Sequence, residues 1–291
     1  MSAAAERRRG ALFIIAASVC WSFGGLCIKF IPWDAMTIVG LRAAFAAAVF
    51  IAYRRSAKIN FTKGNVLAAV CLSSTTTLFV FANKLTTAAS AILLQFTAPV
   101  FIIIIHLVFY SKKPKPSELI AVAATLAGML LFFADDLDAG AMLGNFIAIA
   151  SGLSFAGVFV CNNRPDTQPE QALLLGFIVN VIIGLPFVLT GVTAEPAAWG
   201  LIVFLGVVQV GLAYVFFAIG IKKTTALLAC LITAIEPVLN PIWVAVATYL
   251  IIGAPEIPGP AAVAGGAIII ISVVGYNVWV EKKEKARPAN T

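Results

Sequence analysis

Two charged residues lie inside long apolar stretches of this sequence, where a charge is costly. Arg42 follows about seven apolar residues of one stretch, and Glu236 lies about twelve residues into another. A charge at the centre of a bilayer costs at least about 2.5–3.5 kcal/mol, so such residues face protein or water and often mark a path for substrate or ions. We interpret Arg42 and Glu236 as an intramembrane charge pair. The pair either holds two helices together or serves a substrate or proton, and the sequence leaves both roles open.

Two prolines occupy matching stretches in the two halves of the chain. Pro99 stands near the end of TTAASAILLQFTAPV (86–100), and Pro237 near the end of TTALLACLITAIEPV (224–238). A proline removes a helix hydrogen bond and clashes with the preceding turn. In membrane helices it is tolerated as a packed kink or beside a cavity. The matching placement favours a hinge at both positions.

Other side chains in these stretches suit the binding of a small amphipathic molecule. Gln95 and Thr233 hold matching positions four residues before the two prolines, and the indole N–H of Trp21 needs a partner. Lone Ser and Thr residues in such helices mostly bond to their own backbone, so Thr75, Thr76, Thr77, Ser154 and Gln209 are weaker candidates. The candidate cavity residues are Trp21, Ser22, Phe79, Asn83, Gln95, Phe155, Tyr214, Thr233 and Trp243.

The composition predicts the surroundings of this protein. Of its 291 residues, 61% are hydrophobic and 11% are charged, with a mean hydropathy of +1.01. Soluble proteins carry about 25% charged residues, so this chain cannot cover its surface with polar groups. The composition therefore predicts an all-α membrane protein in contact with the lipid bilayer. The net charge of +7 comes from loops and chain ends, so nucleic acid is not an expected partner. The five cysteines lie in apolar runs and should be free thiols.

The apolar stretches predict ten transmembrane helices, because about 20 apolar residues span a bilayer. Basic loops such as 54–63 and 111–116 alternate with acidic ones such as 135–138. By the positive-inside rule, both termini should be cytoplasmic. The predicted spans are Gly10–Phe30, Ala35–Tyr53, Gly64–Lys84, Ala88–Tyr110, Ser117–Ala134, Ala141–Cys161, Ala172–Thr190, Ala197–Gly220, Thr225–Leu250 and Pro260–Val280.

An internal repeat relates the two halves. Besides the proline stretches, WSFGG (21–25) matches LSFAG (153–157), and LFVFA (78–82) matches YVFFA (214–218). Five spans in each half mean that the second half enters the membrane in the opposite direction. The prediction is therefore two inverted five-helix repeats, 1–140 and 141–291, which together form one transport domain with its site near midplane.

The ten spans, the repeat, WSFGG and the two proline stretches resemble the EamA family of the drug/metabolite transporter superfamily. Within it, the chain is most similar to bacterial exporters of aromatic amino acids. The resemblance implies a transporter of the bacterial inner membrane that works by alternating access, without a cofactor or metal. The sequence leaves the oligomeric state open, with a monomer as one option. The chain departs from the family after the ninth span, where Gly253 is followed by Ala254 and not by glutamate.

Other functions remain as alternatives. Glu236 could serve as the counter-charge in an exporter of small cationic drugs. An exporter of phosphorylated sugars or nucleotide sugars needs cations in its cavity, and Arg42 is the one cation deep in a predicted span. An intramembrane enzyme is not expected, because the chain has one histidine, His106, and no paired acids at depth. The driving force, proton exchange or facilitated diffusion, stays open.

Overall fold

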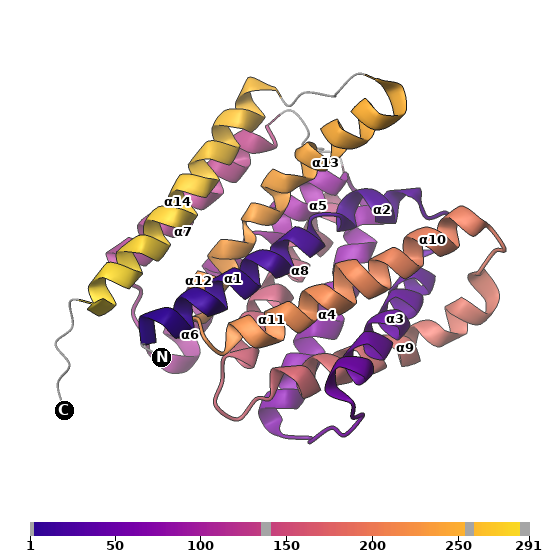
Figure 1. The fold of residues 1–291 in the computed structure, drawn as a ribbon, viewed down its shortest axis with the longest axis horizontal. Coiled ribbons are helices and arrows are strands. Elements are labelled where there is room, and N and C mark those ends of the chain that lie inside the picture. The colour runs from indigo at the N-terminus through magenta and orange to yellow at the C-terminus, as the bar shows by residue number, and fades with distance from the viewer. Residues whose placement is uncertain (1–2, 135–140, 254–258, 286–291) are drawn as a thin grey trace.

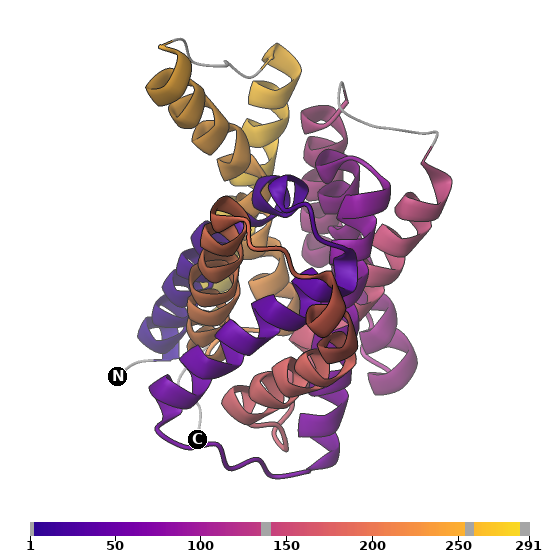
Figure 2. The same ribbon diagram turned by 90° about the vertical axis from the view of Figure 1, so that its right-hand side faces the viewer.

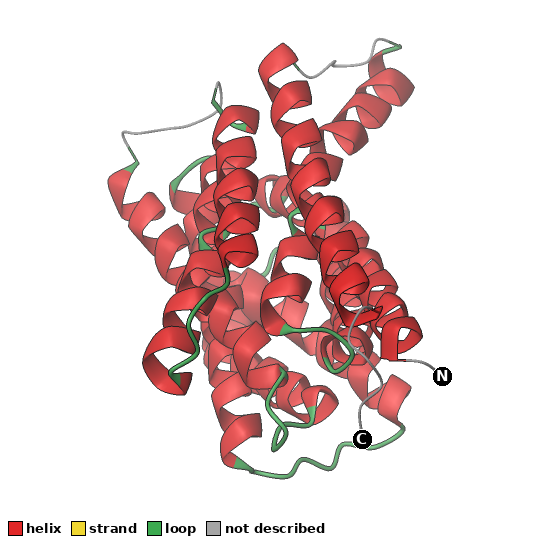
Figure 3. Ribbon diagram, turned by 90° about the vertical axis from the view of Figure 1, so that its left-hand side faces the viewer, coloured by secondary structure: helices red, strands yellow, loops and turns green. Residues whose placement is uncertain are grey.

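The computed structural model describes residues 3–134, 141–253 and 259–285, and in this part the chain consists of helices and loops (Figures 1 and 3). The elements in chain order are α1 Ala3–Trp21, α2 Gly24–Phe30, α3 Ala35–Arg54, α4 Lys63–Leu85, α5 Ala88–Gln95, α6 Ala98–Tyr110, α7 Pro116–Phe132, α8 Met142–Asn162, α9 Pro169–Gly191, α10 Pro196–Phe204, the π-helix η1 Leu205–Leu212, α11 Ala213–Ile221, α12 Ala226–Thr233, α13 Ile235–Ile252 and α14 Pro260–Lys285.

Every predicted span is helical within the described residues, and seven helices there are long and apolar enough to cross a membrane. The chain is therefore a multi-pass membrane protein. Helix α1 begins earlier than predicted, so the basic ERRR sequence at 6–9 is helical. Four spans are interrupted, at residues 22–23, at 96–97, at 234 and by the π-helix η1. The acidic loop 135–138 lies outside the described residues.

Side-chain caps set the start of several helices, because the first N–H groups of a helix have no partner within it. Asp34 accepts hydrogen bonds from the backbone N–H groups of Met36 and Thr37 at 2.8 and 3.0 Å. Thr87 caps α5 through the Ser90 N–H, and Thr225 caps α12 through the Leu228 N–H. Thr87 and Thr225 occupy matching positions of the two proline stretches, so the sequence match is also a match in local structure.

The central helices pack closely, with α4 against α8 and α9, and α3 against α9. At the crossing of α3 and α9, a Cβ added to Gly184 would lie 2.5 Å from Gly40 Cα. Small residues let helix backbones approach in this way. Helix α7 packs mainly against α14, and Figure 1 shows this helix pair at one side of the bundle. The start of α1 and the end of α14 lie at the same end of the bundle (Figures 1 and 2).

Two lysines at matching positions of the two halves, Lys84 and Lys222, each belong to a group that ties neighbouring segments together. Lys84 Nζ donates to Ile31 O at 2.7 Å, and Lys29 Nζ donates to Thr86 O at 2.7 Å. We call this group the Lys84 clasp. Each bond also satisfies a backbone carbonyl near a helix end, which would otherwise lack a partner.

The second group, the Lys222 clasp, repeats this arrangement. Lys222 Nζ donates to Arg164 O at 2.5 Å, and Asn163 Nδ2 donates to Thr224 O at 2.8 Å. Helix α4 begins beside the 164–168 loop, where Thr62 Oγ1 donates to Asp166 O, and its 23 residues span about 35 Å. The two clasps therefore lie at opposite ends of the bundle. In that loop, a hydrogen bond from the Arg164 guanidinium lowers the pKa of Asp166, which keeps their ion pair charged at neutral pH.

Candidate functional site

A small cavity lies where the two halves of the chain meet, and it gathers polar, charged and aromatic side chains. Its volume is about 40 Å³. Because a water needs about 10–15 Å³ of such space, this conformation has room for a few waters but not for an aromatic amino acid. The lining residues are Trp21, Arg42, Thr75, Thr76, Phe79, Gln95, Phe155, Gln209, Val210, Tyr214 and Glu236.

Aromatic rings form one wall of the cavity. The centre of the Trp21 ring lies 4.9 Å from the centre of the Tyr214 ring and 6.1 Å from that of the Phe155 ring, and each pair is in edge-to-face contact. Trp21 is 5% exposed, so the wall is packed and not open to lipid. Such edge-to-face pairs add about 0.5–1.5 kcal/mol beyond the burial of their surface. The wall is therefore ordered, and it could receive the apolar part of a substrate.

The break between α1 and α2 brings Gln209 to this wall. The break leaves the Trp21 carbonyl at the end of α1, and Gln209 Nε2 donates to it at 3.3 Å. Gly24 permits this approach, because a Cβ there would lie 2.5 Å from Gln209 Nε2. The other amide atom, Gln209 Oε1, is buried and has no hydrogen-bond partner within the described residues. The cavity thus holds an unused acceptor.

Arg42 and Glu236 both line the cavity, but no ion pair joins them in the described structure, contrary to the predicted charge pair. Arg42 Nη2 instead donates to Thr76 O at 3.3 Å. Helix α3 packs against α4, α9 and η1, whereas α13 packs against α1 and α14. Since no ion pair joins the two charges within the described residues, each can contact a molecule bound in the cavity.

Gln95, from α5, adds a neutral amide to the cavity that Arg42 and Glu236 line. Its Nε2 donates to Ser151 Oγ at 2.7 Å, and that hydroxyl donates to Thr75 O at 3.2 Å. The amide is therefore held in place by a chain of hydrogen bonds from α5 through α8 to α4. Its matching residue, Thr233, donates to the Cys230 carbonyl at 2.6 Å and does not line the cavity.

Three more predicted cavity residues lie away from the cavity lining. Trp243 Nε1 donates to Ser22 Oγ at 2.8 Å, and the Trp243 ring stacks on Phe23 at 4.8 Å. These contacts join α13 to the break between α1 and α2. Asn83 Nδ2 donates to Phe79 O, four residues earlier in its own helix. In this conformation, Ser22, Asn83 and Trp243 connect helices or bond locally.

The two prolines begin the second parts of interrupted spans. Pro99 lies in the first turn of α6, after the break at 96–97, and Pro237 lies in the first turn of α13, after the break at 234. Proline suits this place because the N–H groups of a first turn have no partner within the helix. The breaks lie at matching positions of the two stretches. A hinge at these breaks stays a prediction.

Three cavity residues, Thr75, Thr76 and Gln209, ranked only as weaker candidates in the sequence. The π-helix η1, which presents Gln209, has no clear signal in the sequence except the two glycines within it, Gly206 and Gly211. A Cβ on Gly206 would lie 2.9 Å from Arg42 O, so this glycine lets η1 pack directly on the backbone of α3. That contact sets Gln209 beside Arg42.

The five cysteines are free thiols, as predicted from their apolar surroundings. In an apolar helix bundle a thiol packs as a small hydrophobic group. Disulfides therefore take no part in holding the cavity together.

Comparison with known proteins gives the family. The EamA-like transporter family matches this chain twice, over residues 8–134 and 142–278. An uncharacterized transporter of Bacillus subtilis (strain 168), YwfM, is 24% identical to it over 298 residues, covering 96% of this chain and 97% of that protein. A solved crystal structure shares the fold with a TM-score of 0.77 at 19% identity, covering 96% of this chain and all of that one. The chain therefore belongs to the EamA-like transporter family.

Proposed function

We propose that this transporter exports aromatic and other large hydrophobic amino acids through the central cavity. One observation carries the proposal: a buried guanidinium, a buried carboxylate and four aromatic side chains line the same cavity. An amino acid has one negative group, one positive group and a side chain. The cavity offers a complementary partner for each of these three parts.

The carboxylate of the substrate would bind Arg42, whose planar guanidinium suits two parallel hydrogen bonds to a carboxylate. The substrate ammonium would bind Glu236 and the unused acceptor Gln209 Oε1. Its ring would contact Trp21 and Phe155. Because the two substrate charges meet two opposite charges, the loaded cavity is neutral, which limits the cost of moving it through the membrane.

The alternatives fit the cavity less well. A small cation would satisfy Glu236 but would leave the Arg42 charge facing it, and like charges repel. A phosphorylated sugar would satisfy Arg42 but would lie near Glu236. Of the two, the cationic drug is favoured, because Glu236 makes no hydrogen bond or ion pair within the described residues.

We propose that the ten spans form two inverted repeats, 1–140 and 141–291, that work by alternating access. Matching caps at Thr87 and Thr225 support the repeat, as do matching breaks before Pro99 and Pro237. The small volume of the cavity means that helices must separate to admit substrate. The Lys84 and Lys222 clasps, at opposite ends of the bundle, are suited to open one at a time.

Transport into proteoliposomes tests the substrate. Protein reconstituted with internal phenylalanine should take up radiolabelled tryptophan by exchange, and leucine or tyrosine should compete. Lysine and glutamate should compete weakly, because their extra charge has no partner in the cavity. The control is an empty liposome, together with protein-containing vesicles loaded without phenylalanine. Exchange of a quaternary ammonium or of a sugar phosphate, without movement of aromatic amino acids, would refute the proposal while leaving the family unchanged.

Cysteine labelling tests the orientation that we propose, with both termini in the cytoplasm of a bacterial inner membrane. On a background that lacks the five native cysteines, Lys113→Cys should react with a membrane-impermeant maleimide only after cells are opened. Glu195→Cys should react in intact cells, because it lies in a loop on the opposite side. Both positions are exposed. Labelling of Lys113→Cys in intact cells would contradict the orientation, and labelling of both positions in intact cells would also contradict the predicted spans between them.

A further inference from the structure

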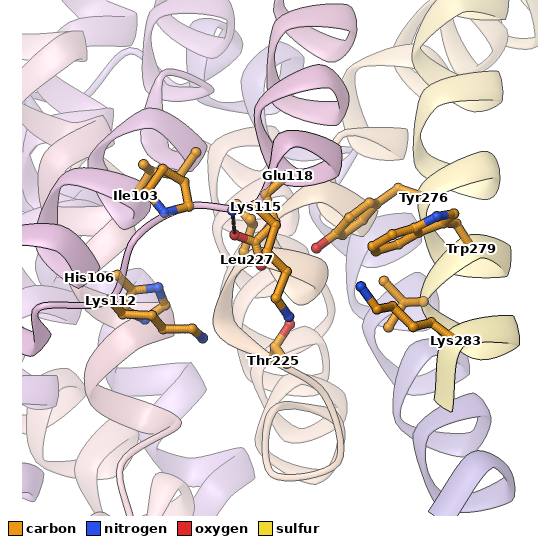
Figure 4. A pocket seen from close by; sticks show the side chains of 12 residues that line it. Ile103, His106, Lys112, Lys115, Glu118, Thr225, Leu227, Tyr276, Trp279 and Lys283 are labelled. Atoms are coloured by element: carbon orange, nitrogen blue, oxygen red, sulfur yellow. Dashed lines mark hydrogen bonds between the residues drawn. The ribbon is translucent and has the colours of Figure 1, made fainter. Parts of the chain in front are cut away.

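A second cavity lies away from the central site, at the end of the bundle where α6 leads into α7. Its volume is about 130 Å³, and it is bounded by α6, α7, α12 and α14. Figure 4 shows Lys112, Lys115 and Lys283 around it, with the rings of Tyr276 and Trp279 on the α14 side. We call this cavity the basic groove. The central cavity makes no use of any of these residues.

Among the described residues that line the basic groove, positive side chains outnumber negative ones. Three lysines, one histidine and one carboxylate, Glu118, line it. Glu118 Oε2 accepts a hydrogen bond from the Lys115 backbone N–H at 2.9 Å, as the dashed line in Figure 4 shows, so this carboxylate is engaged at the start of α7. Lys283 Nζ lies 4.9 Å from the centre of the Trp279 ring. The chemistry of the groove therefore suits an anion of one or two charges.

An apolar groove continues from the same place along the helix pair α7 and α14. Its volume is about 360 Å³, and it shares Tyr276 and Trp279 with the basic groove. Apart from Ser117 and Ser272, its other lining residues are apolar, among them Ile120 and Ile271, which are 68% and 70% exposed. Gly275 keeps the groove open, because a Cβ there would meet nothing within 4 Å. A ligand that fills both grooves must have an anionic head and a long apolar chain.

We propose that the two grooves together bind one anionic phospholipid. Its phosphate would contact Lys112, Lys115 and Lys283, and an acyl chain would lie between α7 and α14. Basic pockets between membrane helices bind acidic headgroups in this way, and Tyr and Trp belong at the level of the headgroups. The headgroup would thereby lie where α6, α7, α12 and α14 meet, and the acyl chain would follow the α7–α14 pair. The proposal does not depend on the identity of the transported substrate.

Quenching of tryptophan fluorescence by brominated lipids tests the proposal. Purified protein is titrated in detergent with brominated phosphatidylglycerol or brominated phosphatidylcholine, and Trp279→Phe identifies the part of the signal that comes from the groove. Brominated phosphatidylglycerol should quench Trp279 at a concentration at least about tenfold lower than brominated phosphatidylcholine does. The reason is that each lysine raises the affinity for an anionic lipid roughly fivefold. The triple variant K112Q/K115Q/K283Q should bring the two lipids to within about twofold. The three lysines are exposed, so this variant should keep the elution volume of the wild type.

A matched variant and a soluble competitor make the result decisive. R55Q/K58Q/K63Q removes three exposed cations from the segment that runs from the end of α3 to the first residue of α4, at the same end of the bundle, and it should keep the preference for phosphatidylglycerol. Equal quenching by the two lipids, or an unchanged preference in K112Q/K115Q/K283Q, would overturn the proposal. Glycerol 3-phosphate should not displace the lipid at millimolar concentration, because it lacks an acyl chain. Displacement would show that the groove binds a soluble phosphate compound and would overturn the lipid assignment.

Discussion

Arg42→Gln and Glu236→Gln should each slow tryptophan exchange by roughly 10- to 150-fold. A hydrogen bond to a charged group contributes about 1.5–3 kcal/mol, and every 1.4 kcal/mol changes binding about tenfold. Each substitution removes one charged partner of the substrate but keeps the shape of a polar side chain. Both residues are buried, at 3% and 8% exposure, so water replaces the lost contact poorly. The measurement is initial-rate exchange of radiolabelled tryptophan in proteoliposomes with equal protein content.

Two substrate analogues separate recognition from folding. Tryptamine lacks the carboxylate and indole-3-propionate lacks the ammonium, so both should compete weakly with tryptophan on the wild type. On the Arg42→Gln variant, tryptamine should compete about as well as unlabelled tryptophan does, because a substrate carboxylate no longer gains binding energy from residue 42. Glu236→Gln should lose its discrimination against indole-3-propionate for the corresponding reason. If both variants slow exchange yet keep the wild-type order of competitors, the two charges support the helices and do not recognise substrate.

Gly184→Val should destabilise the folded protein severely, because α3 and α9 cross backbone to backbone at this residue. An added Cβ would lie 2.5 Å from Gly40 Cα and 2.8 Å from Gly40 N. Overpacking usually costs about 1–3 kcal/mol. Here the clash is with backbone and no side chain can move away, so we expect the upper part of that range or more. The measurements are the yield of monodisperse protein in detergent and its midpoint of thermal unfolding.

Gly200→Val provides the matched control for this prediction. Gly200 lies in helix α10, and a Cβ added there would meet nothing within 4 Å. The substitution carries the same change in side chain and a similar cost in helix propensity. Its yield and unfolding midpoint should stay near those of the wild type. Equal losses for Gly184→Val and Gly200→Val would show that α3 and α9 do not approach as closely as the structure has them.

The lysines around the basic groove can have two roles, as signals of membrane orientation and as contacts for a lipid headgroup. In the sequence, Lys112, Lys115 and Lys283 indicate which side of the membrane their segments face. More than 160 residues separate Lys283 from the other two. Packing of α14 against α7 brings them to one cavity and adds Tyr276 and Trp279 between them. The proposed lipid site is therefore recognisable only in the tertiary structure.

The sequence by itself determined the class of this protein and the positions of its helices. Lipid cannot hydrogen-bond the backbone, so long apolar stretches must be helical, and charge and turn residues mark where they end. The sequence also predicted Trp21 and Gln95 as cavity residues, and Arg42 and Glu236 as an intramembrane charge pair. The reason is the same in each case: a polar group in an apolar helix must turn toward protein or water.

Only the tertiary structure decided which partner each polar group takes. The position of a residue along a span gives its depth, but neither the rotation of the helix nor its neighbours. Arg42 and Glu236 were predicted to form a charge pair, yet no ion pair joins them within the described residues, and Arg42 bonds to Thr76 O. The π-helix that presents Gln209 likewise depends on tertiary packing. Gly206 is needed there only because η1 packs directly against the backbone of α3. Such contacts join segments that are far apart in the chain, so a local sequence pattern cannot predict them.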